Sequence, residues 1–258
     1  MKANQFFVSK SLEFFRPVYD GRMGLTCVNE SGYDSIAPCL FFGMYRNDDL
    51  ERLFNHKGPR IVLWGGGDAQ KVDVLKVIGI FHDIKHISTS QYIDHALRMV
   101  GLEPTYVSLP ATIPERWVNQ DAPPATLGNK IYCYAPNELY GLSIAQLVGK
   151  EVPYEIIYGT SDRSKDWKVL KELYSQCFMG LRLKEFDGVA ATVQEMGLMG
   201  RRTVWNGGTP SAIAWNSVDD ILRAIEKEAL RIGKTAPVEE VSRQVQSWIC
   251  TNNDWLEV

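Results

Sequence analysis

Short apolar runs alternate with amphipathic segments along the whole chain. Runs typical of buried strands occupy 39–45 (CLFFGMY), 60–65 (RIVLWG), 85–90 (KHISTS) and 105–110 (TYVSLP). Between them, 47–56 and 90–101 begin with good capping residues and carry apolar positions at helical spacing. Strands that alternate with helices favour parallel sheets, so the first half of the chain is predicted to be an α/β unit.

A second alternating series fills the other half of the chain. Its runs lie at 130–136, 140–149, 154–160, 166–176, 177–183 and 202–207, and two amphipathic helices follow at 218–233 and 237–250. Residues 114–130 between the two series are polar and contain the pair Pro123–Pro124, which is typical of a linker. The pattern predicts two α/β domains, over 1–122 and 123–235, and a C-terminal helix and tail over 236–258.

The segment 181–208, LRLKEFDGVAATVQEMGLMGRRTVWNGG, carries the most specific pattern. It follows an apolar run and precedes a short β-branched and aromatic run, so the expected order is strand, loop, helix, strand. The helix is predicted from Val189 to Met199 and should end at Gly200, with Arg201 and Arg202 forming a cationic C-terminal end. Such a βαβ unit implies parallel strands.

Two carboxylates flank the start of this predicted helix. The backbone N–H groups of Gly188, Val189 and Ala190 lack partners within the helix, and the helix dipole adds positive charge, so they could hold a diphosphate. Glu195 lies roughly 10 Å further along the helix axis, within reach of a ribose diol. Asp187 precedes the helix and would face the sugar. The spacing predicts a nucleotide-sugar site.

The same residues resemble the C-terminal domain of retaining glycosyltransferases with the GT-B fold, whose signature is an acid, seven residues and a glutamate. The chain reads DGVAATVQE and then MGLMGRRTVWN. The resemblance implies that Asp187 contacts the donor sugar, that Gly188 and Val189 hold the diphosphate, and that Glu195 binds the ribose. The first acid is usually glutamate, so Glu185 is expected to share the sugar contact. The likeness is strongest to short glycosyltransferases of large algal DNA viruses.

The resemblance implies two Rossmann-like α/β domains that face a cleft, the acceptor side being 1–122 and the nucleotide-sugar side 123–235. The C-terminal helices would cross back to the N-terminal domain. The expected activity is retaining transfer from a nucleotide diphosphate sugar to a hydroxyl of a glycan or glycoprotein acceptor. A GDP-sugar is favoured, such as one of rhamnose or fucose. The family scheme requires no cofactor or divalent metal, and the sequence has no Asp-x-Asp motif.

Loops at strand ends supply further candidates for donor binding. Many GT-B enzymes place an arginine, and then Lys-Gly, after the first strand of the second domain, whereas this chain has PNELYG there. The positive charge is therefore expected from Arg182, Lys184 or Arg163. The other candidates in this half are Asn137, Tyr140 and Gly159.

A glycine cluster, IVLWGGGDA, follows a predicted strand in the first half. Gly66 and Gly67 would let the donor approach the backbone, and Asp68 is a candidate catalytic contact to an acceptor hydroxyl. A plain tight turn is an equal alternative. The cluster also loosely resembles the methyl-donor loop of Rossmann-type methyltransferases, although no carboxylate follows the next strand until Asp94.

Two other interpretations of the acid pair remain open. Asp187 could be an ordinary helix N-cap, with Glu195 a solvated carboxylate on an ordinary βαβ helix. The chain could also be a GT-B-like protein that binds a sugar or nucleotide without transferring it. The aspartate in place of glutamate and the absent basic pair permit that second reading.

Composition narrows the function classes. The 258 residues are 45% hydrophobic and 23% charged, and the net charge of −3 argues against broad nucleic-acid binding. Five scattered cysteines without a CxxC motif indicate neither a disulfide framework nor a zinc site, which fits a reducing cytoplasm. No run resembles a signal peptide or approaches the ~20 apolar residues of a membrane span. His82 and His86 lack a third ligand, so no metal site is predicted.

Overall fold

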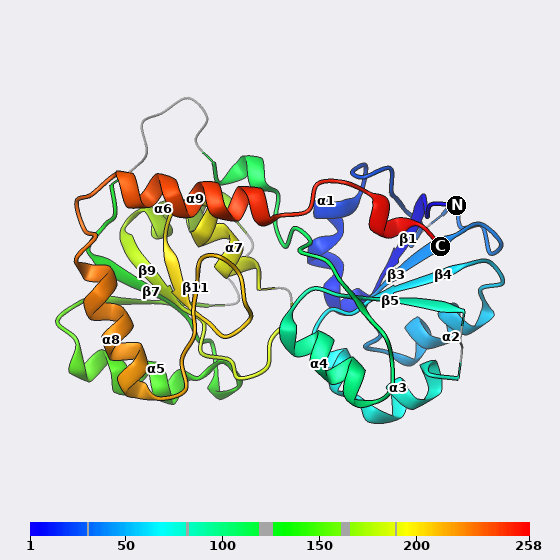
Figure 1. Ribbon diagram of the computed structural model, residues 1–258, viewed down its shortest axis with the longest axis horizontal. Helices are drawn as coiled ribbons and strands as arrows, with labels where there is room; N and C mark the ends of the chain where they lie inside the picture. The colour runs from blue at the N-terminus through cyan, green and yellow to red at the C-terminus, as the bar shows by residue number, and fades with distance from the viewer. Residues whose placement is uncertain (30, 81–82, 119–125, 161–165, 189) are drawn as a thin grey trace. The chain divides into compact units, whose positions relative to one another are not determined.

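The computed structural model describes residues 1–29, 31–80, 83–118, 126–160, 166–188 and 190–258 (Figure 1). The chain forms two compact units. The N-terminal unit comprises Met1–Ala111, Phe186–Val189 and Cys250–Val258, and the C-terminal unit comprises Thr112–Glu185 and Ala190–Ile249. The chain therefore passes between the units more than once.

The N-terminal unit is built on a parallel six-stranded sheet with the order β2-β1-β3-β4-β5-β6. Its strands are β1 (Gln5–Val8), β2 (Thr26–Cys27), β3 (Cys39–Phe42), β4 (Arg60–Leu63), β5 (Ile84–Ser88) and β6 (Thr105–Tyr106). Its helical elements are η1 (Lys10–Phe15), α1 (Arg16–Tyr19), α2 (Asn47–Asn55), η2 (Gly67–Gln70), α3 (Val72–Ile78), α4 (Gln91–Met99) and η6 (Asp254–Leu256). The central strands are continuous apolar runs because both of their faces are covered.

The C-terminal unit is built on a parallel five-stranded sheet with the order β11-β10-β9-β7-β8. Its strands are β7 (Lys130–Tyr134), β8 (Ile156–Gly159), β9 (Cys177–Leu181), β10 (Arg202–Val204) and β11 (Ala212–Ile213). Its helical elements are η3 (Pro114–Arg116), η4 (Glu138–Tyr140), α5 (Leu142–Glu151), α6 (Trp167–Ser175), α7 (Ala191–Leu198), α8 (Val218–Ala229) and α9 (Ala236–Trp248).

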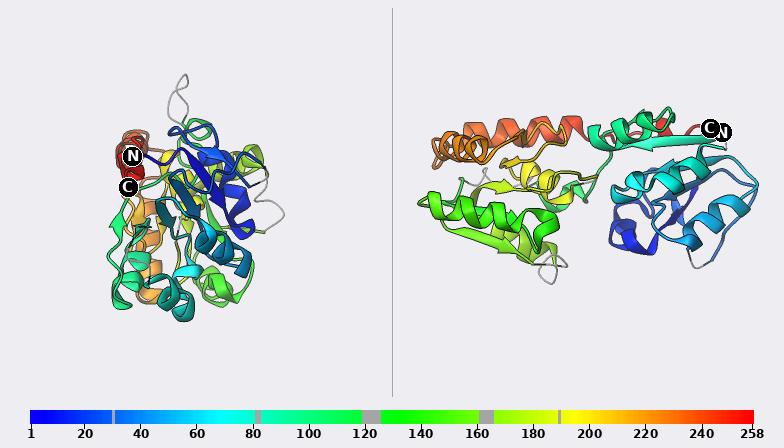
Figure 2. Two further views of the ribbon diagram at one scale, coloured as in Figure 1. Left: turned by 90° about the vertical axis from the view of Figure 1, so that its right-hand side faces the viewer. Right: turned by 90° about the horizontal axis from the view of Figure 1, so that it is seen from below.

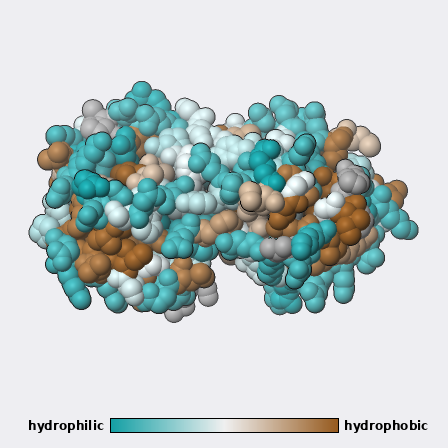
Figure 3. Space-filling model, turned by 60° about the horizontal axis from the view of Figure 1, so that its bottom comes forward, coloured by the Kyte–Doolittle hydropathy of each residue, from teal (hydrophilic) through white to brown (hydrophobic). Residues whose placement is uncertain are grey.

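Helices cover both faces of each sheet (Figure 2). In the C-terminal unit, α5 and α8 supply one apolar cluster and α6, α7 and α9 supply most of another. On the face drawn in Figure 3, apolar residues gather in patches among hydrophilic ones. Among the described residues, no helix has the length and apolar character needed to cross a lipid bilayer.

The two parallel sheets confirm the prediction of two Rossmann-like α/β domains. The predicted strands and helices are present, mostly shorter by a few residues, and the motif helix runs from Ala191 to Leu198. The sequence did not indicate β1, β2 or β11. The last two are only two residues long, and β1 is a four-residue aromatic run that ends just before polar residues.

The division of the chain differs from the predicted boundary at 122. The chain enters the C-terminal unit at Thr112, because Trp117 donates a hydrogen bond to the Thr112 hydroxyl at 2.7 Å and stacks on Tyr174 of α6. The Pro123–Pro124 pair lies outside the described residues.

The C-terminal helices were expected to cross back to the N-terminal domain, and the structure differs from this expectation in detail. Helix α9 stays in the C-terminal unit, where Ser242 donates to the carbonyl of Leu198 at 2.6 Å. The following tail, Cys250–Val258, belongs to the N-terminal unit. Its backbone bonds there include one from the Ala3 N–H to the Leu256 carbonyl at 3.0 Å.

One buried cation ties three elements of the C-terminal unit together. Arg201, which is 1% exposed, donates to the backbone carbonyls of Ser175, Cys177 and Met199. These carbonyls lie at the end of α6, the start of β9 and the end of α7. Burial lowers the pKa of Arg201 to about 10, so the side chain stays charged at neutral pH. The predicted cationic end of the motif helix is confirmed in this form.

We expect Arg201→Met to lower the free energy of unfolding by about 2–4 kcal/mol. The apolar replacement keeps the length of the side chain but leaves three buried carbonyls without their charged donor. Urea denaturation at pH 7 measures the loss, with Arg223→Met on exposed α8 as the control. Equal losses in the two variants would contradict a structural role specific to Arg201.

Candidate functional site

The C-terminal unit has a topological switch point between β7 and β9. From β7 the chain continues through α5 to β8 on one side, whereas from β9 it continues through α7 to β10 on the other. In open parallel sheets, ligands bind beyond the carboxyl ends of the two strands at such a point. The residues that follow β7 and β9 therefore form the first candidate site.

Two cations and two tyrosines meet at these strand ends. The guanidinium of Arg182, immediately after β9, lies 4.8 Å from the ring centres of both Tyr134 and Tyr140. The Lys184 ammonium lies 5.1 Å from the Tyr140 ring centre. Arg182 is 9% exposed, so the stacked rings hold its charge in a fixed, partly desolvated position. The structure thus brings the predicted residues Arg182, Lys184 and Tyr140 together, and adds Tyr134.

Helix α7 carries Glu195 into the interior of the unit. Every residue from Thr192 to Leu198 is buried, which explains why the helix shows no polar face. The Glu195 carboxylate accepts a hydrogen bond from the Tyr174 hydroxyl at 3.0 Å and another from Thr112. It is therefore not the solvated carboxylate of an ordinary helix.

Burial dominates the ionisation of Glu195. Desolvation raises its pKa to about 7, although the bonds from Tyr174 and Thr112 and the positive charges of Arg182 and Arg116 oppose that shift. A carboxyl with a pKa near neutrality changes charge in the physiological range. The positive charge that reaches it includes that of Arg182, which links α7 to the switch point.

An aromatic cluster fixes the donors to Glu195. The Trp117 and Tyr174 rings stack with centres 5.6 Å apart, and Tyr132 packs edge-on to Tyr174 at 4.8 Å. Gly159, at the end of β8, permits this packing because a Cβ there would lie 2.1 Å from the Tyr132 hydroxyl. The predicted Gly159 thus has a packing role beside the site.

The first half of the acid motif lies in the N-terminal unit. Its backbone meets the glycine cluster after β4, and a Cβ added to Gly188 would lie 2.2 Å from the Gly65 carbonyl oxygen. The Ser90 hydroxyl donates to the Asp187 carbonyl at 3.2 Å. Gly66 has a φ of 143°, a conformation that favours glycine. The close approach of the two loops explains the glycines on both.

Asp187 does not cap helix α7. The N-cap position is Ala190, which makes no side-chain cap bond, and the Asp187 carboxylate accepts instead from the N–H of Gly188 at 3.2 Å. The interpretation of Asp187 as an ordinary N-cap is therefore wrong. Asp187 lies buried near Tyr45, whose pKa is raised by burial and by the charges of Asp68 and Asp187.

Asp68 is completely buried and holds the glycine loop. Its two carboxylate oxygens accept hydrogen bonds from the backbone N–H groups of Met44, Gly65, Gly66 and Ala69, at 2.8–3.2 Å. Burial raises the pKa of Asp68, and these four donors oppose the shift. The arrangement gives Asp68 a loop-holding role, and its contact with an acceptor hydroxyl stays a prediction.

The remaining predicted residues lie in several different elements of the two units. Asn137 caps η4 through the Leu139 N–H at 3.1 Å, Glu185 is exposed, and Gly67 begins η2. Arg163 and Val189 lie outside the described residues.

His86 is buried in β5. Its Nδ1 accepts from the Trp64 indole at 3.3 Å, and burial lowers its pKa to about 4. The side chain therefore packs in the interior of the N-terminal unit. His82 lies outside the described residues.

Sequence reasoning missed Thr112, Tyr174 and Tyr45. Tyr174 and Thr112 reach Glu195 from elements distant in the sequence, so no local pattern marks them. Tyr45 was the last residue of the predicted strand run 39–45, whereas β3 ends at Phe42.

No family model and no curated protein matches the sequence. Solved structures do match it. Sucrose-phosphate synthase from Thermosynechococcus elongatus has a TM-score of 0.61 at 12% identity, over 94% of this chain and 73% of that one. HepE from Anabaena, solved with UDP and glucose, has a TM-score of 0.58 at 8% identity, over 94% of this chain and 98% of that one.

A third match is TarM from S. aureus, with a TM-score of 0.56 at 10% identity. The match covers 93% of this chain but only 55% of TarM, so this chain spans little more than half the length of that relative. The three alignments extend over both units of this chain. The chain has the GT-B fold. At these identities the likeness establishes the GT-B fold alone.

We expect Gly188→Ala to destabilise the GT-B fold by about 1–3 kcal/mol, because the new methyl group would overlap the Gly65 carbonyl. Gly67→Ala in the facing glycine cluster is the matched control, since its Cβ would meet nothing closer than 3.9 Å. Thermal and urea unfolding measure both variants. An unchanged Gly188→Ala would contradict the close approach of the two loops.

We expect Glu195→Gln to change how stability depends on pH. The pKa of Glu195 in the folded protein, about 7, lies above the ordinary 4.5, so the fold loses stability as pH rises through that window. Glutamine does not ionise. At pH 8 the variant should therefore be more stable than the parent by up to about 3 kcal/mol, and the two should converge near pH 4.5.

Urea denaturation between pH 4.5 and 8 measures this difference. The control is Glu172→Gln, which removes an exposed carboxylate from α6 and should leave the pH profile unchanged. Parallel profiles for Glu195→Gln and the parent would show that Glu195 is not held in a desolvated environment.

Proposed function

We propose that the protein is a glycosyltransferase that binds a nucleotide diphosphate sugar on its C-terminal unit and passes the sugar to a hydroxyl of a glycan. The observation that supports the proposal is the buried Glu195 of α7 together with Arg182, which follows β9 at the switch point and whose charge reaches Glu195. A buried acceptor and a fixed cation there match the ribose and the diphosphate of a nucleotide. The GT-B fold agrees with this chemistry.

Each part of the donor has a candidate partner. The Glu195 carboxylate accepts from the ribose hydroxyls, and Tyr174 and Thr112 hold it in position. Arg182 and Lys184 face the diphosphate, together with N–H groups at the start of α7. Because Arg182 is already stacked on two tyrosines, it loses little further conformational freedom when the donor binds.

During the transfer step, negative charge develops on the leaving diphosphate. As the bond between the sugar and the diphosphate breaks, negative charge grows on the phosphate oxygen that leaves. The guanidinium of Arg182, the ammonium of Lys184 and the dipole of α7 stabilise that charge in this scheme. The scheme retains the anomeric configuration and uses no divalent metal. Asp187, with Glu185 as the second candidate, contacts the transferred sugar.

The sequence favoured a GDP-sugar, such as one of a deoxyhexose, and that preference stays a prediction. HepE was solved with UDP and glucose. The nucleobase is therefore the first property to measure.

The test is a thermal-shift titration with GDP, UDP, ADP, CMP and S-adenosyl methionine in the presence of EDTA. A ligand that binds only the folded protein raises the melting temperature with its concentration. We expect stabilisation by one nucleoside diphosphate, and its loss in Glu195→Ala. An unchanged melting temperature with every nucleoside diphosphate would overturn the proposal. Stabilisation by S-adenosyl methionine alone would favour a methyltransferase.

Turnover distinguishes a transferase from a protein that only binds the nucleotide. Transferases release sugar slowly from the donor when no acceptor is present. We expect Asp187→Ala to lower this hydrolysis more than it lowers nucleotide affinity. A protein that binds the nucleotide but shows no hydrolysis with any tested donor sugar would be a non-catalytic GT-B protein.

We expect Arg182→Ala to weaken binding of the selected nucleoside diphosphate by about 10–100-fold, because a charge-assisted contact to phosphate is lost. Arg182→Lys should restore only part of the affinity, since lysine keeps the charge but loses the planar stacking on Tyr134 and Tyr140. Isothermal titration calorimetry measures both variants. The control is Lys150→Ala at the end of α5, which removes a positive charge elsewhere in the unit.

A further inference from the structure

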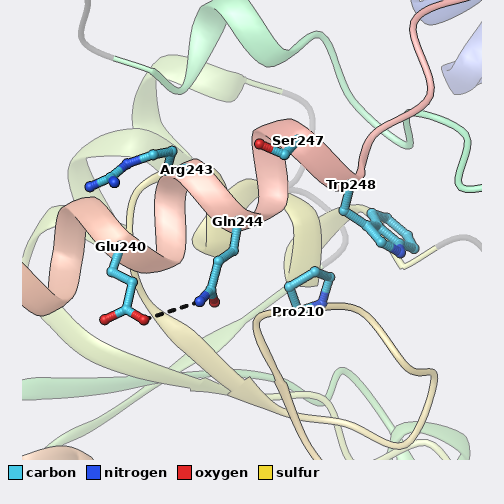
Figure 4. Close-up of a pocket in the computed structure, with 6 residues that line it drawn as sticks. All are labelled: Pro210, Glu240, Arg243, Gln244, Ser247 and Trp248. Atoms are coloured by element: carbon cyan, nitrogen blue, oxygen red, sulfur yellow. Dashed lines mark hydrogen bonds between the residues drawn. The ribbon is translucent and has the colours of Figure 1, made fainter.

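Helix α9 presents a second, unassigned groove on the C-terminal unit (Figure 4). The groove is shallow and open to solvent, with a volume of about 540 Å³. Its lining residues are Pro210, Glu240, Arg243, Gln244, Ser247 and Trp248. None of them belongs to the donor site proposed above.

The helical repeat explains why these side chains share one surface. Positions 240, 243, 244, 247 and 248 follow the spacing of three and four residues that defines a single helix face. The apolar residues Val241 and Val245 are buried on the other side of α9. The outward face therefore combines polar side chains with one large aromatic ring.

The two ends of the groove differ in chemistry. Trp248 and Pro210 supply apolar surfaces at one end, where Pro210 projects from the loop between β10 and β11 (Figure 4). Trp248 is only partly exposed because it packs against the apolar cluster of α6, α7 and α9, which fixes its indole plane. A fixed aromatic plane binds a ligand at a low cost in conformational entropy.

The other end of the groove carries planar polar groups. The Gln244 amide donates to the Glu240 carboxylate at 3.2 Å, and this bond orients both groups (Figure 4). Arg243 adds a guanidinium along the opposite edge of the helix, and Ser247 adds a hydroxyl on that edge, near Trp248 (Figure 4). Each of these groups forms directional hydrogen bonds with hydroxyl groups.

The charges exclude the commonest alternative ligands. Glu240 and Arg243 have opposite charges, so the lining has no net charge. A phosphate would meet the carboxylate of Glu240, and an organic cation would meet the guanidinium of Arg243. A neutral ligand with one apolar face and several hydroxyl groups avoids both repulsions.

We propose that this groove binds a neutral segment of a glycan. The C–H face of one pyranose ring packs on the Trp248 indole and the Pro210 ring, and hydroxyls of the adjoining saccharide unit bond to Gln244, Glu240 and Arg243. The site is a glycan-holding subsite separate from the donor site. It does not depend on the proposed transferase activity, because a protein that only binds glycans could use the same groove.

The test uses saturation-transfer difference NMR on the full chain with maltotriose, cellotriose and mannotriose as neutral probes. Glucose 6-phosphate is the charged comparison. We expect saturation transfer to at least one neutral trisaccharide and weaker transfer to the phosphate. Absence of transfer to all three trisaccharides, or stronger binding of glucose 6-phosphate, would overturn the proposal.

Variants locate the binding on α9. Gln244→Ala and Glu240→Gln alter exposed side chains, so the fold should be retained. Each variant should lower the affinity for the trisaccharide by at least about fivefold. Arg223→Ala on α8 is the matched control. Undiminished binding in both groove variants would place the saccharide elsewhere and overturn the proposal.

Nucleotide binding separates this site from the proposed function. We expect Gln244→Ala to keep the thermal shift with a nucleoside diphosphate while it loses the trisaccharide. Failure of the nucleotide titration alone leaves the saccharide result intact, and failure of the saccharide result alone leaves the nucleotide site intact.

Discussion

The C-terminal unit depends on one buried guanidinium. Arg201 joins the end of α6, the start of β9 and the end of α7 through their backbone carbonyls. These three elements deliver the candidate site: α6 carries Tyr174, α7 carries Glu195, and Arg182 follows β9. The charge of Arg201 thus holds together the three elements that carry these groups. The local interaction that closes the helix ends also aligns the residues proposed to bind the donor.

Because α7 is buried, the ionised form of its one carboxyl group, that of Glu195, is destabilised. An ordinary surface helix would expose its glutamate, and the group would then ionise at its usual pKa. Here the helix packs between the sheet and α9 so closely that a Cβ on Gly197 would lie 2.5 Å from the Ser211 hydroxyl. Glu195 has to fit the interior, and its raised pKa records that constraint. A buried carboxyl with a raised pKa is typical of functional sites.

Local patterns were sufficient for most of the fold. The central strands are continuous apolar runs, and Gly200, with a φ of 82°, ends the motif helix as its position suggested. Strands β2 and β11 are too short to produce a periodic signal, and β1 becomes recognisable only through its pairing with β3. These misses share one cause, because long-range pairing rather than local sequence defines those strands.

The candidate site was only partly predictable for the same reason. The spacing of Asp187 and Glu195 and the charge of Arg182 are visible in the sequence. The hydroxyl donors to Glu195 are not, because Thr112 and Tyr174 approach it through tertiary packing. Asp68 makes contacts that spacing alone does not reveal: four backbone N–H groups bind its carboxylate, and its proposed contact with an acceptor hydroxyl stays a prediction. Sequence spacing cannot separate a carboxylate that meets a ligand from one that meets the backbone.

The N-terminal unit is assembled from three separate stretches of chain, of which Phe186–Val189 and Cys250–Val258 are continuous with the C-terminal unit. No single cut in the polypeptide therefore releases this unit intact. Unfolding of the C-terminal unit would pull on two segments that are continuous with it. These are the loop that packs against Gly65 and the tail that bonds to Ala3. The two units are consequently expected to melt in one cooperative transition rather than as independent domains, even though each has its own sheet and core.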